Sequence, residues 1–169
     1  MIEAVRGDIT IQRVDAIVNA ANQSLLGGGG VDGAIHDAAG PRLLAACREL
    51  RRTTHPDGLA VGDVVATEAG DLPCEWVIHT VGPDRYAGET DPELLRSCFA
   101  RSIALAAELR CATLAVPAVS AGIFGWDAEE VAEIAVAAAV ASTEEHPLEL
   151  IRFVLFNQDV FEAFARRLS

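Results

Sequence analysis

Strand-like and helix-like segments alternate from one end of the chain to the other. Short apolar or β-branched runs bounded by Gly, Pro or polar residues predict six strands, at residues 1–7, 15–21, 62–68, 75–81, 113–119 and 150–156. Apolar residues at helical spacing predict helices from Gly33, from Pro41 to about Leu50, and over residues 92–109, 126–143 and 160–168. This alternation predicts an α/β fold with helices on both faces of a largely parallel sheet, in which ligands bind at the carboxyl ends of the strands.

Composition and charge narrow the class of protein and its partners. The 169 residues are 51% apolar and 22% charged, which predicts one globular domain, residues 1–169, with a substantial core. The formal net charge of −12 argues against nucleic-acid binding, which depends on a basic surface. We therefore expect an anionic ligand to be bound by main-chain N–H groups and helix N-termini.

Location and metal binding can be predicted from the same sequence. The first residues lack the apolar run of a signal peptide, and the longest aliphatic stretch, residues 134–141, is too short to cross a bilayer. We therefore expect a cytoplasmic protein without a membrane contact. Cys47, Cys74, Cys98 and Cys111 lie 27, 24 and 13 residues apart, which fits neither a zinc site nor a disulfide framework, so reduced core cysteines are expected.

Four consecutive glycines occupy residues 27–30, just before Val31 and Asp32. Ordering such a run costs conformational entropy, so it is either a flexible linker or a loop whose backbone something approaches closely. The pattern G-x-G-x-x-G occurs at Gly28, Gly30 and Gly33, but residues 51–56 stand where a Rossmann fold needs its second strand, and no Gly-Lys-Ser/Thr of a P-loop follows. Because the run leads into a helix, its unhindered N–H groups can bind a pyrophosphate.

Residues 117–126 repeat this arrangement after another buried strand. Ser120, Gly122 and Gly125 permit a tight turn just before a helix that starts near Asp127. Phe124 lies between two flexible points, where it either packs in the core or covers a bound ligand. Two strand-to-helix glycine loops suggest one ligand whose two phosphates are bound from opposite sides.

Several segments carry a family resemblance when taken together. "GDIT", "DAIVNAAN", "GGGGVDGAIHDAAG", "VIHTVGP" and "PAVSAGIFG" occur in this order between Gly7 and about Trp126. In this combination the chain resembles the macrodomain family, close to the class that includes MacroD-type ADP-ribosyl hydrolases and bacterial O-acetyl-ADP-ribose deacetylases. The resemblance implies a three-layer α/β/α sandwich with a mixed, mostly parallel sheet of about six strands.

The resemblance also implies which residues bind ADP-ribose. Asp8 would accept a hydrogen bond from the adenine amine with Ile9 beside it, and Phe156 would stack on the adenine. The diphosphate would lie between two loops, to which the implied binding residues Gly28, Gly29, Gly30, Val31, Gly33, Ser120, Ala121, Gly122, Ile123, Phe124 and Gly125 belong. From the residues alone, a turn or helix cap explains Asp8 and core packing explains Phe156.

Two residues carry the catalytic expectation. The resemblance assigns Asn22 to the distal ribose hydroxyls and to catalysis, Asp32 to the attacking water, and Asn19 to a supporting role in the binding site. Their residue types leave turn formation by the asparagines and helix capping by Asp32 open. His36, four residues after Asp32, invites a catalytic pairing that helix packing explains equally well, and His79 is expected to be a hydrogen-bonded structural histidine on a buried strand.

Two stretches depart from the family pattern. Residues 55–63, "HPDGLAVGD", replace a Cys-Pro-Thr-Gly-like turn, and relatives often have Thr after Ser120 and Tyr in place of Phe124. Because Asn22 and Asp32 are unchanged, the resemblance implies hydrolysis of the ester between the distal ribose and a protein Asp or Glu, and of O-acetyl-ADP-ribose. It implies a monomer with ADP-ribosylated proteins as partners and no metal or cofactor. A non-catalytic ADP-ribose reader and an ADP-ribose 1″-phosphate phosphatase are the alternatives.

Overall fold

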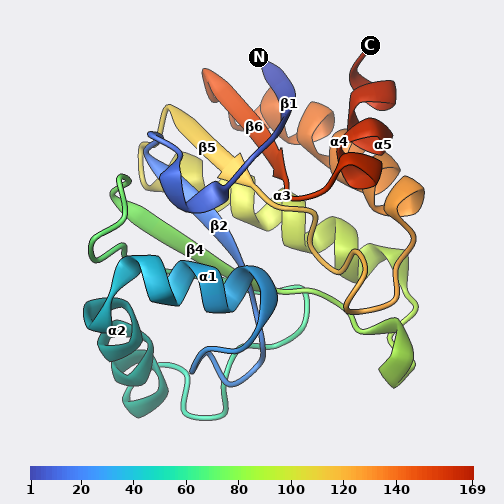
Figure 1. Ribbon diagram of the computed structural model, residues 1–169. Helices are drawn as coiled ribbons and strands as arrows, with labels where there is room; N and C mark the ends of the chain where they lie inside the picture. The colour runs from blue at the N-terminus through green and yellow to red at the C-terminus, as the bar shows by residue number, and fades with distance from the viewer.

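Six strands and five helices make up the computed structural model, which describes residues 1–169 (Figure 1). The strands are β1 (Ile2–Arg6), β2 (Ala16–Ala21), β3 (Val64–Glu68), β4 (Trp76–Val81), β5 (Thr113–Val116) and β6 (Leu150–Leu155). The helices are α1 (Gly30–Ala39), α2 (Pro41–Arg52), α3 (Pro92–Glu108), α4 (Ala128–Glu145) and α5 (Gln158–Leu168), and short 3-10 helices lie at Ile9–Ile11 and Arg85–Ala87. The predicted order of elements is confirmed.

All strands form one sheet in the order β1-β6-β5-β2-β4-β3. Every neighbouring pair is parallel except β3 and β4, which are antiparallel. The mixed, mostly parallel sheet is therefore confirmed. The antiparallel strand β3 lies at an edge, so it leaves the order of the central parallel strands undisturbed.

Helices cover both faces of the sheet, which makes three layers. Figure 1 shows α1 and α2 together on one side of the strands, with α3, α4 and α5 on the other. Along β2, Ala16 and Val18 pack in the 25-residue core under α3, α4 and α5, while Ile17 between them packs in an 11-residue core against Ile35 of α1 and Leu43 of α2. This alternation follows from the two-residue period of a strand, and it makes both faces of β2 apolar.

Strands β2 and β5 mark the point where the chain changes faces. They are parallel neighbours, yet β2 is followed by α1 on one face and β5 by α4 on the other. Such a divergence opens a crevice at the carboxyl ends of the two strands, where α/β proteins bind their ligands. Both glycine-containing loops lie there.

Four of the five helices have boundaries that differ from the prediction by two or three residues. Helix α4 runs over Ala128–Glu145 instead of 126–143, and α5 begins at Gln158 instead of Val160. Helix α1 begins at Gly30 rather than Gly33, and α2 continues to Arg52 beyond Leu50. The first turn of α1 contains two glycines, which are poor helix formers, so local propensity could not reveal it. Asp127 caps α4 as expected, since its side chain accepts a hydrogen bond from the Glu129 N–H.

The remaining sequence features are placed as follows. Cys47, Cys98 and Cys111 are buried, Cys74 is half-buried, and all four thiols are free. None of the helices combines the length and the apolar character that crossing a bilayer requires.

Candidate functional site

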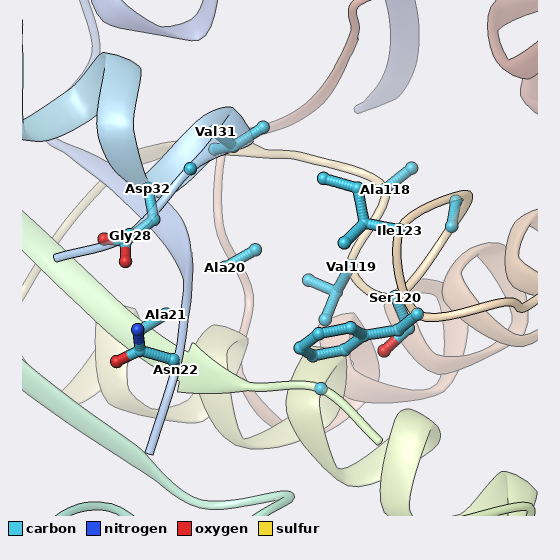
Figure 2. Close-up of a pocket in the computed structure, with 14 residues that line it drawn as sticks. Ala20, Ala21, Asn22, Gly28, Val31, Asp32, Ala118, Val119, Ser120 and Ile123 are labelled. Atoms are coloured by element: carbon cyan, nitrogen blue, oxygen red, sulfur yellow. The ribbon is translucent and has the colours of Figure 1, made fainter. Parts of the chain in front are cut away.

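A pocket of about 250 Å³ opens at the carboxyl ends of β2 and β5. Figure 2 shows Asp32, Gly28 and Asn22 along one side of it and Ser120, Val119 and Ile123 along the other. The lining residues are Ala20, Ala21, Asn22, Gly28, Gly29, Val31, Asp32, Gly82, Ala118, Val119, Ser120, Ala121, Ile123 and Phe124. Asp32 is the one charged side chain among them, so this pocket offers no Arg or Lys to an anion.

The glycine loop presents main-chain donors to the pocket. Helix α1 has no side-chain cap at Gly29, and the N–H groups of residues 28–32 donate to no protein acceptor. A Cβ atom on Gly33 would lie 2.6 Å from the Gly28 carbonyl oxygen, so only glycine allows the loop to fold back on the helix. The loop is therefore ordered, and the linker interpretation is wrong.

Asp32 belongs to the first turn of α1 and does not cap it. Its Oδ1 accepts a hydrogen bond of 2.9 Å from Asn19 Nδ2 and lies 3.4 Å from His36 Nε2. The cap interpretation is wrong because the helix starts two residues earlier, so the side chain points to the sheet instead of the helix N–H groups. Burial raises the pKa of Asp32, and the Asn19 hydrogen bond and the His36 charge lower it only in part.

Asn22 faces the same space as Asp32. Its Nδ2 donates to the Gly27 carbonyl oxygen at 2.9 Å, and its Oδ1 accepts from Ser24 Oγ at 2.6 Å. A Cβ atom on Gly28 would lie 3.1 Å from Asn22 Nδ2 and 3.2 Å from Asp32 Oδ2, which places the bare Gly28 backbone between the two side chains. An amide has two N–H groups and two lone pairs, so Asn22 keeps one of each for a ligand.

The second loop closes the pocket from the other side. Ser120 adopts a left-handed backbone conformation with φ of 69°, and its hydroxyl donates to the Pro83 carbonyl oxygen, so the side chain is used to hold the turn. The N–H groups of Ser120 and Phe124 donate to no protein acceptor. Ile123 is 72% exposed and reaches across the pocket, because a Cβ on Gly30 would lie 3.0 Å from its Cδ1. Phe124 is half-buried and lines the pocket.

A neighbouring segment supports this second loop. The Arg85 N–H donates to the Phe124 carbonyl oxygen at 2.8 Å, and the Arg85 guanidinium lies 4.0 Å from the centre of the Trp126 ring. Glu130 pairs with the same guanidinium through two hydrogen bonds of 3.0 Å. The main chain and the side chain of Arg85 therefore hold the end of this loop and the start of α4, a support that the sequence did not single out.

Asp8 and Phe156 lie outside the enclosed pocket. They follow β1 and β6, which are paired, and the Gly7 N–H donates to the Leu155 carbonyl oxygen at 3.0 Å. Asp8 caps the 3-10 helix through a hydrogen bond of 2.8 Å from the Thr10 N–H, which confirms the cap interpretation, but only its Oδ1 is used. Ile9 is buried beneath it, and Phe156 is 85% exposed, so core packing does not explain this phenylalanine.

The structure brings most of the predicted site residues together. Those that line the pocket are Asn22, Gly28, Gly29, Val31, Asp32, Ser120, Ala121, Ile123 and Phe124. Asn19 lies behind Asp32, and Gly30, Gly33, Gly122 and Gly125 shape the loops without lining the space. Sequence reasoning missed Ala20, Ala21, Gly82, Ala118 and Val119. Among these, only Gly82 is of a residue type that marks a close approach in a sequence. In the structure a Cβ at this position would lie 2.1 Å from Ser120 Oγ.

Comparison with known proteins places the chain in a family. A family model described as "Macro domain" matches residues 18–135. A macro domain-containing protein of Streptomyces griseus is 52% identical over 100% of this chain and 95% of its own length, and an O-acetyl-ADP-ribose deacetylase of Klebsiella pneumoniae is 47% identical over 99% and 95%. A solved Oceanobacillus iheyensis macrodomain with ADP superimposes with a TM-score of 0.93 at 39% identity, covering 98% of this chain and 88% of that one. The chain therefore belongs to the macro domain family.

Proposed function

We propose that this protein is an ADP-ribose-binding hydrolase that removes mono-ADP-ribose from acidic side chains of proteins and deacetylates O-acetyl-ADP-ribose. Two comparisons support the ligand and the reaction. The Klebsiella relative is named for the deacetylation of O-acetyl-ADP-ribose, and the Oceanobacillus macrodomain was solved with ADP. Both substrates are esters of the same distal ribose, so one site can serve both.

The order of the strands carries the proposal. From β1 to β2 the sheet order is β1-β6-β5-β2, and the candidate groups follow in the same order. Asp8 and Phe156 after β1 and β6 would bind adenine, the loop after β5 would bind diphosphate, and Asn22 and Asp32 after β2 would bind the distal ribose. Three strand spacings amount to roughly 14 Å, which suits an extended ADP-ribose laid across the strand ends.

The diphosphate would be bound by main chain alone. Its donors would be the N–H groups of residues 28–32 and of Ser120 and Phe124, which have no protein acceptor and belong to the two loops on either side of the pocket. The N-terminus of α1 adds the positive end of a helix dipole. A chain with a net charge of −12 can therefore bind a doubly negative nucleotide without a cationic side chain in the pocket.

Hydrolysis needs a water positioned between Asn22 and Asp32. The water adds to the ester carbonyl carbon, and the bond from that carbon to the ribose oxygen breaks. One water proton ends on the ribose oxygen, and the products are a free carboxylic acid and a ribose hydroxyl. Asp32 Oδ2 would accept the proton, because Oδ1 is occupied by Asn19 and the pKa raised by burial makes this carboxylate a better base near neutral pH.

The variant Asp32→Ala tests this assignment. We expect its turnover of a Glu-linked mono-ADP-ribosylated protein and of O-acetyl-ADP-ribose to fall by roughly a hundredfold or more, because a general base contributes about that much. The affinity for ADP-ribose, measured by calorimetry, should change by less than about tenfold, since main-chain donors supply the binding. Asp37→Ala is the control, because Asp37 is an exposed carboxylate on the same helix and does not line the pocket.

Three outcomes would contradict the proposal. Retained label on the protein and intact O-acetyl-ADP-ribose, despite measurable ADP-ribose binding by the unaltered protein, would indicate a non-catalytic reader. Release of phosphate from ADP-ribose 1″-phosphate without ester hydrolysis would indicate a phosphatase. Equal losses of affinity and turnover in Asp32→Ala would assign this carboxylate a structural role.

A further inference from the structure

A line of buried polar side chains runs from the pocket wall into the sheet. Asp32 of α1 contacts Asn19 of β2, Asn19 contacts His79 of β4, and His79 contacts Thr67 of β3. Asn19 and His79 have no solvent exposure, and Asp32 is 4% exposed. Polar groups this deep need satisfied hydrogen bonds, so the direction of each bond matters.

The hydrogen-bond directions can be assigned from the chemistry of the groups. Asn19 Nδ2 lies 2.9 Å from Asp32 Oδ1 and 3.1 Å from His79 Nδ1, and an amide nitrogen can only donate. His79 Nδ1 must therefore be the unprotonated nitrogen that accepts. The ring proton is then on Nε2, which donates to Thr67 Oγ1 at 2.9 Å.

Only these nitrogen contacts hold the Asn19 amide in its orientation. The Asn19 Oδ1 atom is buried and has no hydrogen-bond partner, so nothing anchors the amide from its oxygen side. If His79 carried its proton on Nδ1, the ring would attract Asn19 Oδ1, and Nδ2 would turn away from Asp32. The carboxylate would then lose its hydrogen bond in a buried place, which is costly.

We propose that His79 is a positioning residue, whose Nδ1 lone pair holds the Asn19 amide so that Asp32 Oδ1 is anchored and Oδ2 faces the pocket. This inference rests on the proposed hydrolase function for its catalytic consequence. It extends the site by one layer, because His79 lies on a different strand and touches neither the pocket nor Asp32.

The groups around His79 and Asp32 favour an uncharged His79 ring. Burial lowers the pKa of His79 to about 3, so the ring is uncharged at neutral pH and keeps its lone pair. His79 faces Asn19, Thr67 and the Cys47 thiol of α2, whose Sγ lies 3.8 Å from Nε2. Asp32 faces Asn19 and, from its own helix, His36, so His36 is the other titratable group that affects this carboxylate.

Two variants of His79 separate positioning from packing. His79→Leu keeps an apolar branch where Nδ1 stood, whereas His79→Asn places an amide oxygen there that can accept from Asn19. In His79→Leu we expect the pKa of Asp32, followed by carbon-13 NMR of its carboxyl group, to rise, because the Asn19 amide loses the acceptor that holds it and its hydrogen bond to the charged carboxylate weakens. Turnover should fall roughly tenfold, and ADP-ribose affinity should stay within about threefold. His79→Asn should restore both values most of the way.

Cys47→Ala is the matched control. It opens a cavity beside Nε2 on the side of His79 away from Asn19. We expect a lower melting temperature and an unchanged titration of Asp32, because the acceptor at Nδ1 remains.

Nitrogen-15 NMR of the unaltered protein tests the inference without any variant. A protonated Nε2 and an unprotonated Nδ1 on His79 are expected, and a protonated Nδ1 would overturn the inference even if His79→Leu does not fold. An unchanged Asp32 titration in a folded His79→Leu would overturn it too. These NMR readouts are independent of turnover, so an inactive unaltered protein with the expected tautomer and titration would contradict the hydrolase proposal and leave the positioning role supported.

Discussion

Three glycines of the pocket loop and of the first turn of α1 have different tasks. Gly33 lies against the Gly28 carbonyl oxygen, Gly28 lies between Asn22 and Asp32, and a Cβ on Gly29 would meet no atom within 4 Å. These three positions share one residue type but differ in what that residue does. A pattern of identical letters cannot show which glycine is needed for folding and which leaves room for a ligand.

Single alanine substitutions should separate these tasks. Gly33→Ala brings a methyl group 2.6 Å from a carbonyl oxygen, so we expect a loss of about 1–3 kcal/mol in the free energy of unfolding together with weakened ADP-ribose binding. Gly29→Ala should leave the unfolding free energy within about 0.5 kcal/mol. Urea denaturation and calorimetry measure both quantities, and equal stability of the two variants would contradict the packing argument.

For single residues, the sequence predicted the site best where the residue type has few possible roles at its position. It identified the polar side chains of the pocket wall, Asn22, Asp32 and Ser120, and it expected His79 to be buried and hydrogen-bonded. It missed the small apolar lining residues such as Ala20 and Val119, because alanine and valine look the same in a core and in a pocket wall. The contact between Asn19 and His79 joins strands 60 residues apart, which no local pattern can reveal.

At the scale of elements, the two pocket loops are held in place by different contacts. The glycine loop is held by its own helix, through the packing of Gly33 on Gly28. The loop after β5 depends on a separate segment, because Arg85 bonds to the main chain of Phe124 and stacks on Trp126. The order of strands and helices was predictable from the periodicity of apolar residues. The contact of Arg85 with the loop after β5 was not, because it joins segments that are distant in the chain.

Arg85→Ala tests that support. The lost stacking on Trp126 and the lost pair with Glu130 should lower the melting temperature slightly and weaken ADP-ribose binding several-fold. Arg96→Ala is the control, because Arg96 forms an ion pair with Glu93 on the surface of α3 and does not line the pocket. If both variants bind ADP-ribose as well as the unaltered protein, Arg85 does not order the loop.

For the whole molecule, the buried His79 links folding to pH. Its pKa is about 3 in the folded protein and near 6.5 in the unfolded chain, so between these values the unfolded chain binds more protons. Stability must therefore fall as pH falls below about 6.5. Asp32 has the opposite effect on stability. Because its pKa is raised in the folded protein, the folded state binds more protons than the unfolded chain above the ordinary carboxyl pKa, so this contribution to stability increases as the pH falls through that range.

This linkage can be measured by comparing the unaltered protein with His79→Asn. From pH 7 to pH 5 we expect protonation of His79 in the unfolded chain to remove about 2 kcal/mol of stability, a loss that the variant lacks. Urea denaturation at the two pH values gives the difference, in which the surface carboxylates cancel because both proteins share them. Identical pH slopes would show that His79 is not buried as a neutral ring.

The absence of cationic side chains around the pocket has a chemical consequence. Free ADP-ribose is a reducing sugar, and its open-chain aldehyde condenses with primary amines to give Schiff bases. The pocket contains no side-chain amine, and the sequence contains no lysine at all. If the protein releases ADP-ribose as proposed, this product meets no ε-amino group of the chain that it could glycate.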